Sequence, residues 1–223
     1  MNLDPVKTTD AVVKRYCNYL ETTFAFNDVN LQKQMSEELR RTEKFYKGPI
    51  LEATPPFETG CSLNSLIEKG VLSTEFRKLQ TEELPLDRNL YLHQEMAVRK
   101  LVEKNRNVIV ATGTGSGKTE TFLIPILNHL FRQKEQGKLG PGVRALLLYP
   151  MNALANDQLK RLRRLIKNYP EITFGSYTGE TEEYENRAKE RFKLMNPKEQ
   201  LLSNELLSRE RIRESPPNIL LTN

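Results

Sequence analysis

The sequence has few of the residues that build disulfide frameworks or zinc centres. Its 223 residues include two cysteines, Cys17 and Cys61, and two histidines, His93 and His129. Two cysteines so far apart in the chain do not form the pattern of a disulfide-stabilised secreted domain. The four side chains also lack the spacing of a structural zinc site. The sequence therefore excludes both classes of protein.

Long hydrophobic runs are also missing. No apolar run approaches the length of about 18 residues that a membrane-spanning helix needs. Residues 1–5 lack the basic and then apolar pattern of a signal peptide. We find no internal repeat and no low-complexity tract. We therefore expect a soluble, cytoplasmic protein with no membrane partner.

The composition is that of a folded protein with a small basic excess. Hydrophobic residues make up 38% and aromatic residues 8%, which is enough for a packed core. The length predicts one or two domains. The formal net charge of +5 weakly favours a polyanionic partner.

The most informative stretch is glycine-rich and covers residues 111–120, with the sequence Ala-Thr-Gly-Thr-Gly-Ser-Gly-Lys-Thr-Glu. It follows the apolar run 108–110, which we expect to be a buried strand. It precedes a helical pattern that places Phe122, Ile126 and Leu130 on one face. A strand, a glycine-rich turn, Gly-Lys-Thr and a helix are the context of a phosphate-binding loop.

Each residue type in this stretch has a chemical role in phosphate binding. Glycines let backbone N–H groups turn toward phosphate oxygens, and the helix N-terminus adds its positive dipole end. Lys118 is expected to reach the β- and γ-phosphates and Thr119 to ligate Mg²⁺. Thr112 stands where the strict pattern has glycine. We expect Glu120 to pair on the helix surface. The expected loop residues are Thr112, Gly113, Thr114, Gly115, Ser116, Gly117, Lys118, Thr119 and Glu120.

A glutamine upstream of the loop is a candidate for reading the base. Gln94 precedes an amphipathic helix that contains Ala97 and Leu101. Its amide can pair with the N6/N7 edge of adenine. We expect the neighbouring His93 to be a packing or capping residue rather than a catalytic base.

Three more apolar segments complete an α/β pattern after the loop. Strands are expected at 143–149, 172–177 and 218–223, and residues 181–214 read as mostly helical. Helices that separate buried strands predict a P-loop, RecA-like parallel sheet with helices on both faces. Pro150 begins the helix after the first of these strands. The exposed backbone amides of this helix are candidates for binding a nucleic-acid phosphate. About half of the cations on this helix are expected to be solvated: Lys160, Arg161, Arg163, Arg164 and Lys167.

The first 85 residues read as a helical accessory region, and residues 86–223 read as the motor domain. Helices are expected at 5–26, with Thr9 as cap, and from 27 or 28 to 45. A third helix is expected after Ser62, with Gly70 as its stop. The region's aromatic side chains are expected in the core. They are Tyr16, Tyr19, Phe24, Phe26 and Phe57.

With these residues in view, the chain resembles the front half of a superfamily 2 DEAD/DEAH-box helicase. Residues 90–94 resemble the adenine-reading Q element, and residues 112–119 resemble motif I. Residues 149–158 resemble motif Ia, 177–179 the TG element, and 220–223 the start of motif Ib. The segment from Lys47-Gly48-Pro49 to Pro55-Pro56-Phe57 is similar to the leader of a bacterial and archaeal subgroup that includes DNA-repair and phage-defence helicases.

The resemblance implies a first motor domain that binds ATP and Mg²⁺, with Lys118 and Thr119 as its catalytic residues. It implies a DNA or RNA strand held through its phosphates without sequence reading, and the subgroup favours DNA. Hydrolysis of ATP would drive strand tracking and duplex separation. The residues implied to hold the strand are Pro150, Asn152, Ala153, Thr178, Gly179, Thr222 and Asn223.

The family's next elements do not occur in the sequence. No Asp-Glu-x-His or Asp-Glu-x-Asp stretch follows Asn223, and no second motor domain with an arginine finger is present. Those carboxylates hold Mg²⁺ and position the attacking water. We therefore expect residues 1–223 to be inactive alone, because they are part of a longer polypeptide or a truncated product. The segment 108–111 would then lack neighbouring strands, unless another chain supplies them.

Two alternatives to a helicase remain open on the sequence. A double-stranded DNA translocase of the restriction or remodelling type shares motif I. A nucleotide- or nucleic-acid-binding module that never hydrolyses ATP would follow if the 223 residues were the whole product. A kinase fits poorly because it leaves Gln94 and the segment 150–158 unexplained.

Overall fold

The computed structural model describes residues 4–41, 45 and 55–223. The chain divides into two compact units, Met1–Pro56 and Phe57–Asn223. The division lies upstream of the boundary expected at residues 85 and 86, because Leu66 and Phe76 join the same hydrophobic core as Leu127. In the part of the chain that the structure describes, no helix has the length and apolar character needed to cross a membrane.

The described residues of the first unit form two helices, α1 (Pro5–Thr23) and α2 (Val29–Arg41). The N-cap of α1 is Asp4, whose carboxylate accepts from the amides of Val6 and Lys7, so the expected Thr9 cap is wrong. The expected break at Lys47-Gly48-Pro49 lies outside the described residues. The expectation of aromatic core residues is also wrong, because their side chains are 42–58% exposed. The exposed side chains are Tyr16, Tyr19, Phe24 and Phe26 in this unit, and Phe57 in the next.

The second unit begins with small elements packed on two helices. In order they are β1 (Thr59–Ser62), α3 (Leu63–Glu68), the 3₁₀ helix η1 (Thr74–Lys78), β2 (Asn89–Tyr91), α4 (Leu92–Val102) and α5 (Glu120–Glu135). β1 and β2 form an antiparallel pair. Ser62 caps α3, and Gly70 follows it with a positive φ of 72°, so both of these expectations are confirmed.

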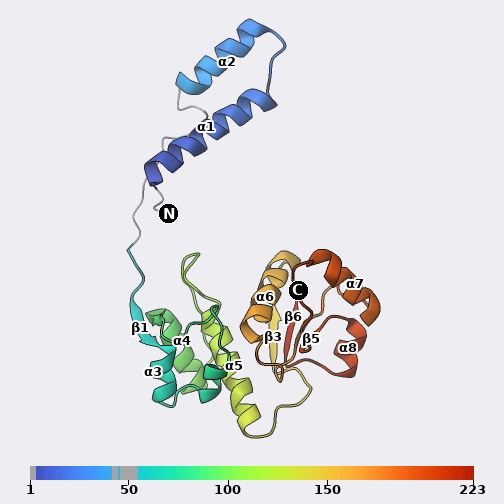
Figure 1. Cartoon of the computed structure of the whole chain (residues 1–223). Helices are drawn as coiled ribbons and strands as arrows, with labels where there is room; N and C mark the ends of the chain where they lie inside the picture. The colour runs from blue at the N-terminus through green and yellow to red at the C-terminus, as the bar shows by residue number, and fades with distance from the viewer. Residues whose placement is uncertain (1–3, 42–44, 46–54) are drawn as a thin grey trace. The chain divides into compact units, whose positions relative to one another are not determined.

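A four-stranded parallel sheet forms the rest of this unit and confirms the expected fold class. Its strands are β3 (Ala145–Leu148), β4 (Phe174–Ser176), β5 (Glu205–Leu206) and β6 (Ile219–Thr222), in the spatial order β3-β6-β4-β5. The helices α6 (Asn152–Ile166), α7 (Glu185–Met195) and α8 (Arg209–Glu214) gather around these strands, while α3, α4 and α5 pack together in another part of the unit (Figure 1). The strand β5 interrupts the region expected to be mostly helical.

The register of the sheet separates a covered face from a partly open one. Leu147 pairs with Leu221, and Phe174 pairs with Ile219, so these four buried side chains share one face. They join the core formed with Leu162, Leu165 and Ile166 of α6. On the other face, Ile212 of α8 lies against Gly175. Leu146 and Leu148 of β3 are 60% and 71% exposed there, so the expectation that this whole apolar run is buried is wrong.

The strand expected at 108–110 does not form. Residues 105–113 have no regular secondary structure, and the side chain of Ile109 is 96% exposed. A strand needs a hydrogen-bonded neighbour. Neither of the two sheets in the described residues includes this segment. The apolar sequence alone therefore does not fix its backbone.

Candidate functional site

The glycine-rich loop between residues 112 and 119 is closed by its own side chains. Gly115 and Gly117 have positive φ values of 74° and 69°, a conformation that favours glycine. The hydroxyls of Thr112 and Ser116 lie 2.6 Å apart and join the two ends of the loop. Lys118 Nζ donates to the carbonyls of Thr112 (2.9 Å) and Gly113 (2.6 Å). The ammonium group thus lies within the loop and bonds to its backbone.

The first turn of α4 holds this loop in place. Gln94 is 2% exposed, and its Nε2 donates to the carbonyl of Gly117 at 2.8 Å while its Oε1 accepts from the amide of Tyr91 at 2.8 Å. His93 Nε2 donates to the carbonyl of Ser116 at 2.9 Å. A Cβ atom on Gly117 would collide with the Gln94 amide. Glycine at position 117 therefore serves both the turn and the contact with α4.

An aromatic cluster surrounds the histidine. The ring of His93 stacks on Tyr91, with centroids 5.7 Å apart, and meets Phe57 edge-on at 5.7 Å. Its ring nitrogen is bonded to the loop. The packing role expected for His93 agrees with this arrangement, and the bond to the loop is additional.

A buried carboxylate fixes the base of α4. Burial alone would raise the pKa of Glu95, but hydrogen bonds from the Cys61 amide (2.6 Å) and the Arg99 guanidinium (2.8 Å) outweigh it and lower that pKa. Glu95 is therefore ionised at neutral pH. It ties β1 to the helix that carries Gln94, so the loop contacts rest on a rigid support.

Glu120 lies in the interior, so the expectation that it pairs on the helix surface is wrong. It is 7% exposed at the start of α5. Its Oε1 accepts from Arg161 of α6 at 2.8 Å and from Arg88, which precedes β2, at 3.3 Å. Its Oε2 has no hydrogen-bond partner among the described residues. Sequence reasoning missed this cluster because its members are far apart in the chain.

Most of the residues expected to hold a strand lie where three parallel strands end. Asn152 starts α6 after β3, Thr178 follows β4, and Thr222 ends β6. Thr222 Oγ1 donates to the carbonyl of Tyr177 at 2.8 Å, which joins two of these segments. Pro150, Ala153, Gly179 and Asn223 are all exposed around them. The fold therefore brings the three expected segments to one edge of the sheet.

Asn152 bonds to both of the neighbouring segments. Its Nδ2 donates to Glu180 Oε1 at 2.8 Å, and its Oδ1 accepts from Asn223 Nδ2 at 2.7 Å. Arg209 of α8 donates to the carbonyl of Thr178 at 2.9 Å. Glu180 and Arg209 were not singled out in the sequence. The sequence signal that could have indicated Glu180 was its position directly after Gly179, which was expected to hold the strand.

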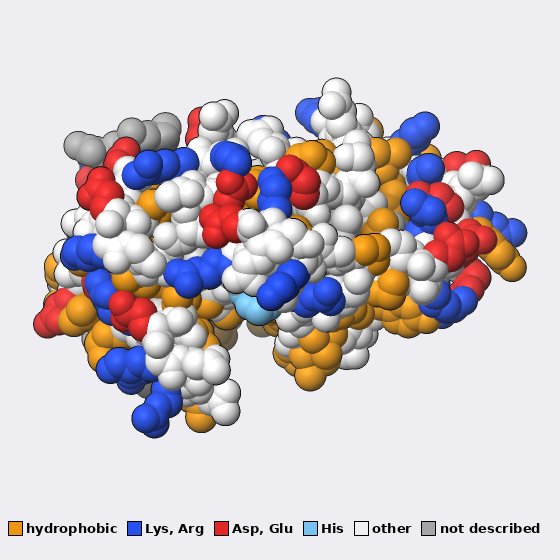
Figure 2. Space-filling view, turned by 90° about the horizontal axis from the view of Figure 1, so that it is seen from below, with side chains coloured by type: hydrophobic (Ala, Val, Ile, Leu, Met, Phe, Trp, Pro, Cys, Tyr) orange, Lys and Arg blue, Asp and Glu red, His pale blue; other side chains and the backbone are white. Residues whose placement is uncertain are grey.

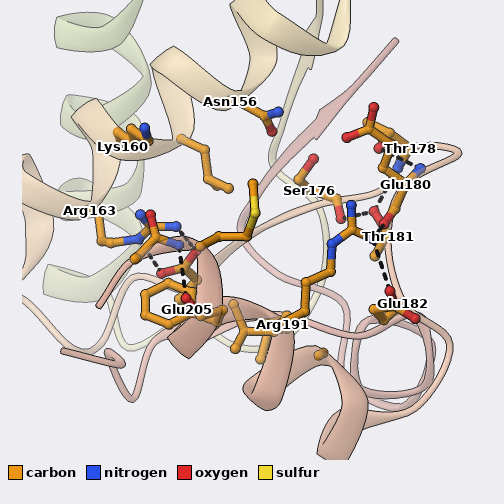
Figure 3. A pocket seen from close by; sticks show the side chains of 17 residues that line it. Asn156, Lys160, Arg163, Ser176, Thr178, Glu180, Thr181, Glu182, Arg191 and Glu205 are labelled. Atoms are coloured by element: carbon orange, nitrogen blue, oxygen red, sulfur yellow. Dashed lines mark hydrogen bonds and ion pairs between the residues drawn. The ribbon is translucent and has the colours of Figure 1, made fainter. Parts of the chain in front are cut away.

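A cavity of about 240 Å³ adjoins this surface between α6 and α7. Figure 3 shows Asn156 and Lys160 on one side, Thr178 and Glu180 on another, and Arg191 directed toward Glu182. The cavity's three basic side chains are matched by three acidic ones: Lys160, Arg163 and Arg191 against Glu180, Glu182 and Glu205. This balance gives no net attraction for a phosphate.

The cations of α6 are mostly paired. Burial would lower the pKa of Arg163, but its hydrogen bonds to Glu205 (2.7 Å) and Glu199 (2.6 Å) raise it. Arg161 bonds to Glu120, and Arg164 bonds to Glu83 at 2.5 Å. Three of the five cations therefore hold the fold together, which the sequence did not indicate. Lys160 and Lys167 are exposed.

Comparison with known proteins agrees with this geometry. The family model for DEAD/DEAH box helicases matches residues 91–211. Druantia protein DruE of Escherichia coli is 35% identical over 193 residues, which cover 80% of this chain and 10% of DruE. ATP-dependent helicase Lhr-Core of Sulfolobus acidocaldarius is 35% identical over 94 residues, which cover 39% of this chain and 11% of Lhr-Core. ATP-dependent RNA helicases are also among the relatives.

A solved structure supports the fold. The helicase MrfA, bound to DNA and AMPPNP, superposes with a TM-score of 0.51 at 22% identity, over 76% of this chain and 18% of that chain. The chain spans about a tenth of the length of the two curated relatives described above. The sheet, the glycine-rich loop and the family match agree, and the chain belongs to the DEAD/DEAH box helicase family.

Proposed function

We propose that this chain is the ATP-binding part of an ATP-dependent helicase or translocase that acts on nucleic acid, and on DNA rather than RNA. The observation that carries the proposal is the loop at 112–119. Two glycines with positive φ precede Lys118 and Thr119 at the start of α5. This arrangement suits a triphosphate, because backbone amides and the helix N-terminus attract phosphate oxygens.

The residues of the loop fit ATP and Mg²⁺ by their chemistry. Lys118 would exchange the carbonyls of Thr112 and Gly113 for phosphate oxygens, which are stronger partners for an ammonium group. The Thr119 hydroxyl is the hard oxygen ligand that Mg²⁺ prefers. Bound Mg²⁺ would neutralise charge on the phosphates during transfer.

Gln94 has spare capacity for adenine. One N–H of its amide nitrogen and one lone pair of its amide oxygen are engaged by Gly117 and Tyr91. An amide has two N–H donors and an oxygen with two lone pairs. The remaining donor and acceptor match the N7 and N6 positions of adenine.

The strand would cross the edge of the sheet where Asn152, Thr178 and Thr222 lie. Side-chain and backbone groups at such an edge hold phosphates without reading sequence. Acidic and basic side chains are interspersed over the face drawn in Figure 2. The face drawn there carries no single broad basic surface.

The preference for DNA draws support from MrfA, whose structure contains DNA. A competition assay tests it with DNA and RNA strands of the same sequence and the complete protein. Tighter binding of DNA is the expected result. Tighter binding of RNA would overturn this part of the proposal and leave the ATP site unaffected.

The principal experiment measures ATP turnover by the complete protein, with and without a single strand. Lys118→Ala is expected to abolish turnover, because the side chain that contacts the phosphates is lost. Lys138→Ala is the matched control, since Lys138 is an exposed lysine in the loop after α5. Turnover that persists in Lys118→Ala would refute the loop assignment.

A further inference from the structure

Glu120 joins three segments that the proposed function does not otherwise connect. Thr119 precedes it directly, Arg88 leads into the strand before the Gln94 helix, and Arg161 belongs to α6. The side chain of Glu120 is 9% exposed and that of Arg161 is 20% exposed. One carboxylate oxygen accepts from both guanidinium groups. The contact therefore links the nucleotide loop to the helix whose first residue is Asn152.

The second carboxylate oxygen faces the loop. A Cβ atom on Gly117 would lie 3.1 Å from Glu120 Oε2, and this oxygen has no partner among the described residues. A movement of Gly117 that accompanies phosphate binding would therefore act on the carboxylate directly. Removing one member of a buried charge cluster leaves the other charges uncompensated, so the cluster resists partial separation.

Helix α6 is suited to carry a displacement. Arg161 lies about two and a half turns from Asn152 on the same helix, at 3.6 residues per turn. Leu162, Leu165 and Ile166 are buried in the core and keep the helix rigid. A shift at Arg161 would thus alter the position of Asn152 and its bonds to Glu180 and Asn223.

We propose that Glu120 is a positioning residue that couples nucleotide binding in the loop to the affinity for the nucleic-acid strand, through Arg161 and α6. This inference rests on the proposed function. Coupling of this kind is reciprocal, so a nucleotide that strengthens strand binding is itself bound more tightly when a strand is present. Loss of a purely structural ion pair would change the stability of the fold, but it would leave unchanged the ratio of strand affinities measured with and without nucleotide.

The test measures strand affinity of the complete protein by fluorescence anisotropy, with and without AMPPNP and Mg²⁺. For the unmodified protein, AMPPNP is expected to strengthen strand binding at least about fivefold, within the usual range of allosteric coupling. Glu120→Gln keeps the shape of the side chain and removes its charge. In this variant the ratio of strand affinity with AMPPNP to strand affinity without it is expected to fall close to one. Arg161→Met removes the partner of Glu120 on α6 and is expected to give the same loss. The double variant is expected to lose no more than either single variant.

Lys167→Met is the matched control. Lys167 follows the last residue of α6 and is exposed. Its ratio is expected to equal that of the unmodified protein. The proposal is overturned if the unmodified protein binds both ligands with a ratio of one, or if Arg161→Met keeps the full ratio. An unmodified protein that binds neither AMPPNP nor a strand would instead refute the proposed function.

Discussion

The side-chain amide of Asn152 donates a hydrogen bond to the carboxylate of Glu180 at 2.8 Å, across the edge where β3 and β4 end. A negative charge therefore lies among the residues proposed to hold phosphates. The amide that would donate to a phosphate oxygen donates to a carboxylate in this structure. Strand binding would have to compete with this bond.

Glu180→Gln is accordingly expected to strengthen strand binding. The substitution removes a charge that repels phosphates and weakens the competing bond, because hydrogen bonds to charged acceptors are the stronger ones. We expect an increase in affinity of about threefold to tenfold at low salt, and a smaller one at high salt as screening increases. Anisotropy titrations at two salt concentrations measure it. Glu190→Gln on the exposed side of α7 serves as the control, and an equal gain there would point to net charge alone.

Gln94→Ala is expected to lower affinity for ATP more than affinity for GTP. The variant removes the donor and acceptor assigned to adenine, and GTP does not depend on them. It also removes the bond to Gly117, which affects both nucleotides. Competition titrations against a fluorescent nucleotide give the two affinities. Equal losses for ATP and GTP would mean that Gln94 only supports the loop.

Gly117→Ala is expected to abolish nucleotide binding. The new methyl group would collide with Gln94, and the positive φ costs an L-residue about 1–2 kcal/mol. Gly140→Ala, outside the loop, is the matched control, since nothing lies within 4 Å of a Cβ there and its φ is not positive. Calorimetric titration with AMPPNP compares the two variants. Tight binding by Gly117→Ala would contradict the loop geometry.

The stability of the second unit is expected to depend on pH through Glu75. Hydrogen bonds from the Lys78 ammonium and from the Tyr169 hydroxyl at 2.5 Å lower the pKa of Glu75 below its ordinary value of 4.5. A lowered pKa in the folded state contributes stability above pH 4.5, and this stability is lost as the pH falls through the folded value.

Glu75→Gln is therefore expected to lower the free energy of unfolding by about 1.5–3 kcal/mol at pH 7, the usual range for hydrogen bonds to charged groups. The difference from the unmodified protein should shrink as the pH drops below 4.5. Thermal unfolding from pH 7 to pH 3 measures it, with exposed Glu68→Gln as the control. A difference that is constant with pH would argue against an ionised Glu75.

Local signals in the sequence predicted local structure well. Ser62 and Gly70 mark the two ends of α3 because a cap and a left-handed stop act on adjacent backbone groups. The parallel sheet also followed from the alternation of apolar strands and helices. The loop at 112–119 was found because its residue types have few other uses.

Contacts between distant residues did not follow from the sequence. The run 108–110 has strand composition, but pairing depends on a neighbour that composition does not reveal. Glu120 meets Arg88 and Arg161 only because the fold brings the segment before β2 and the helix α6 to the start of α5, so its burial was not predictable from a helix surface pattern. Glu180 was overlooked because a carboxylate repels phosphates, so an acidic side chain is not expected among residues that bind a nucleic-acid backbone.

The most direct test of the account is a crystal structure of the complete protein with AMPPNP and Mg²⁺. The account predicts that Lys118 Nζ leaves the carbonyls of Thr112 and Gly113 and contacts a phosphate oxygen, with the Thr119 hydroxyl on the metal. A loop that keeps both of its lysine bonds, with no nucleotide bound at saturating concentration, would contradict it.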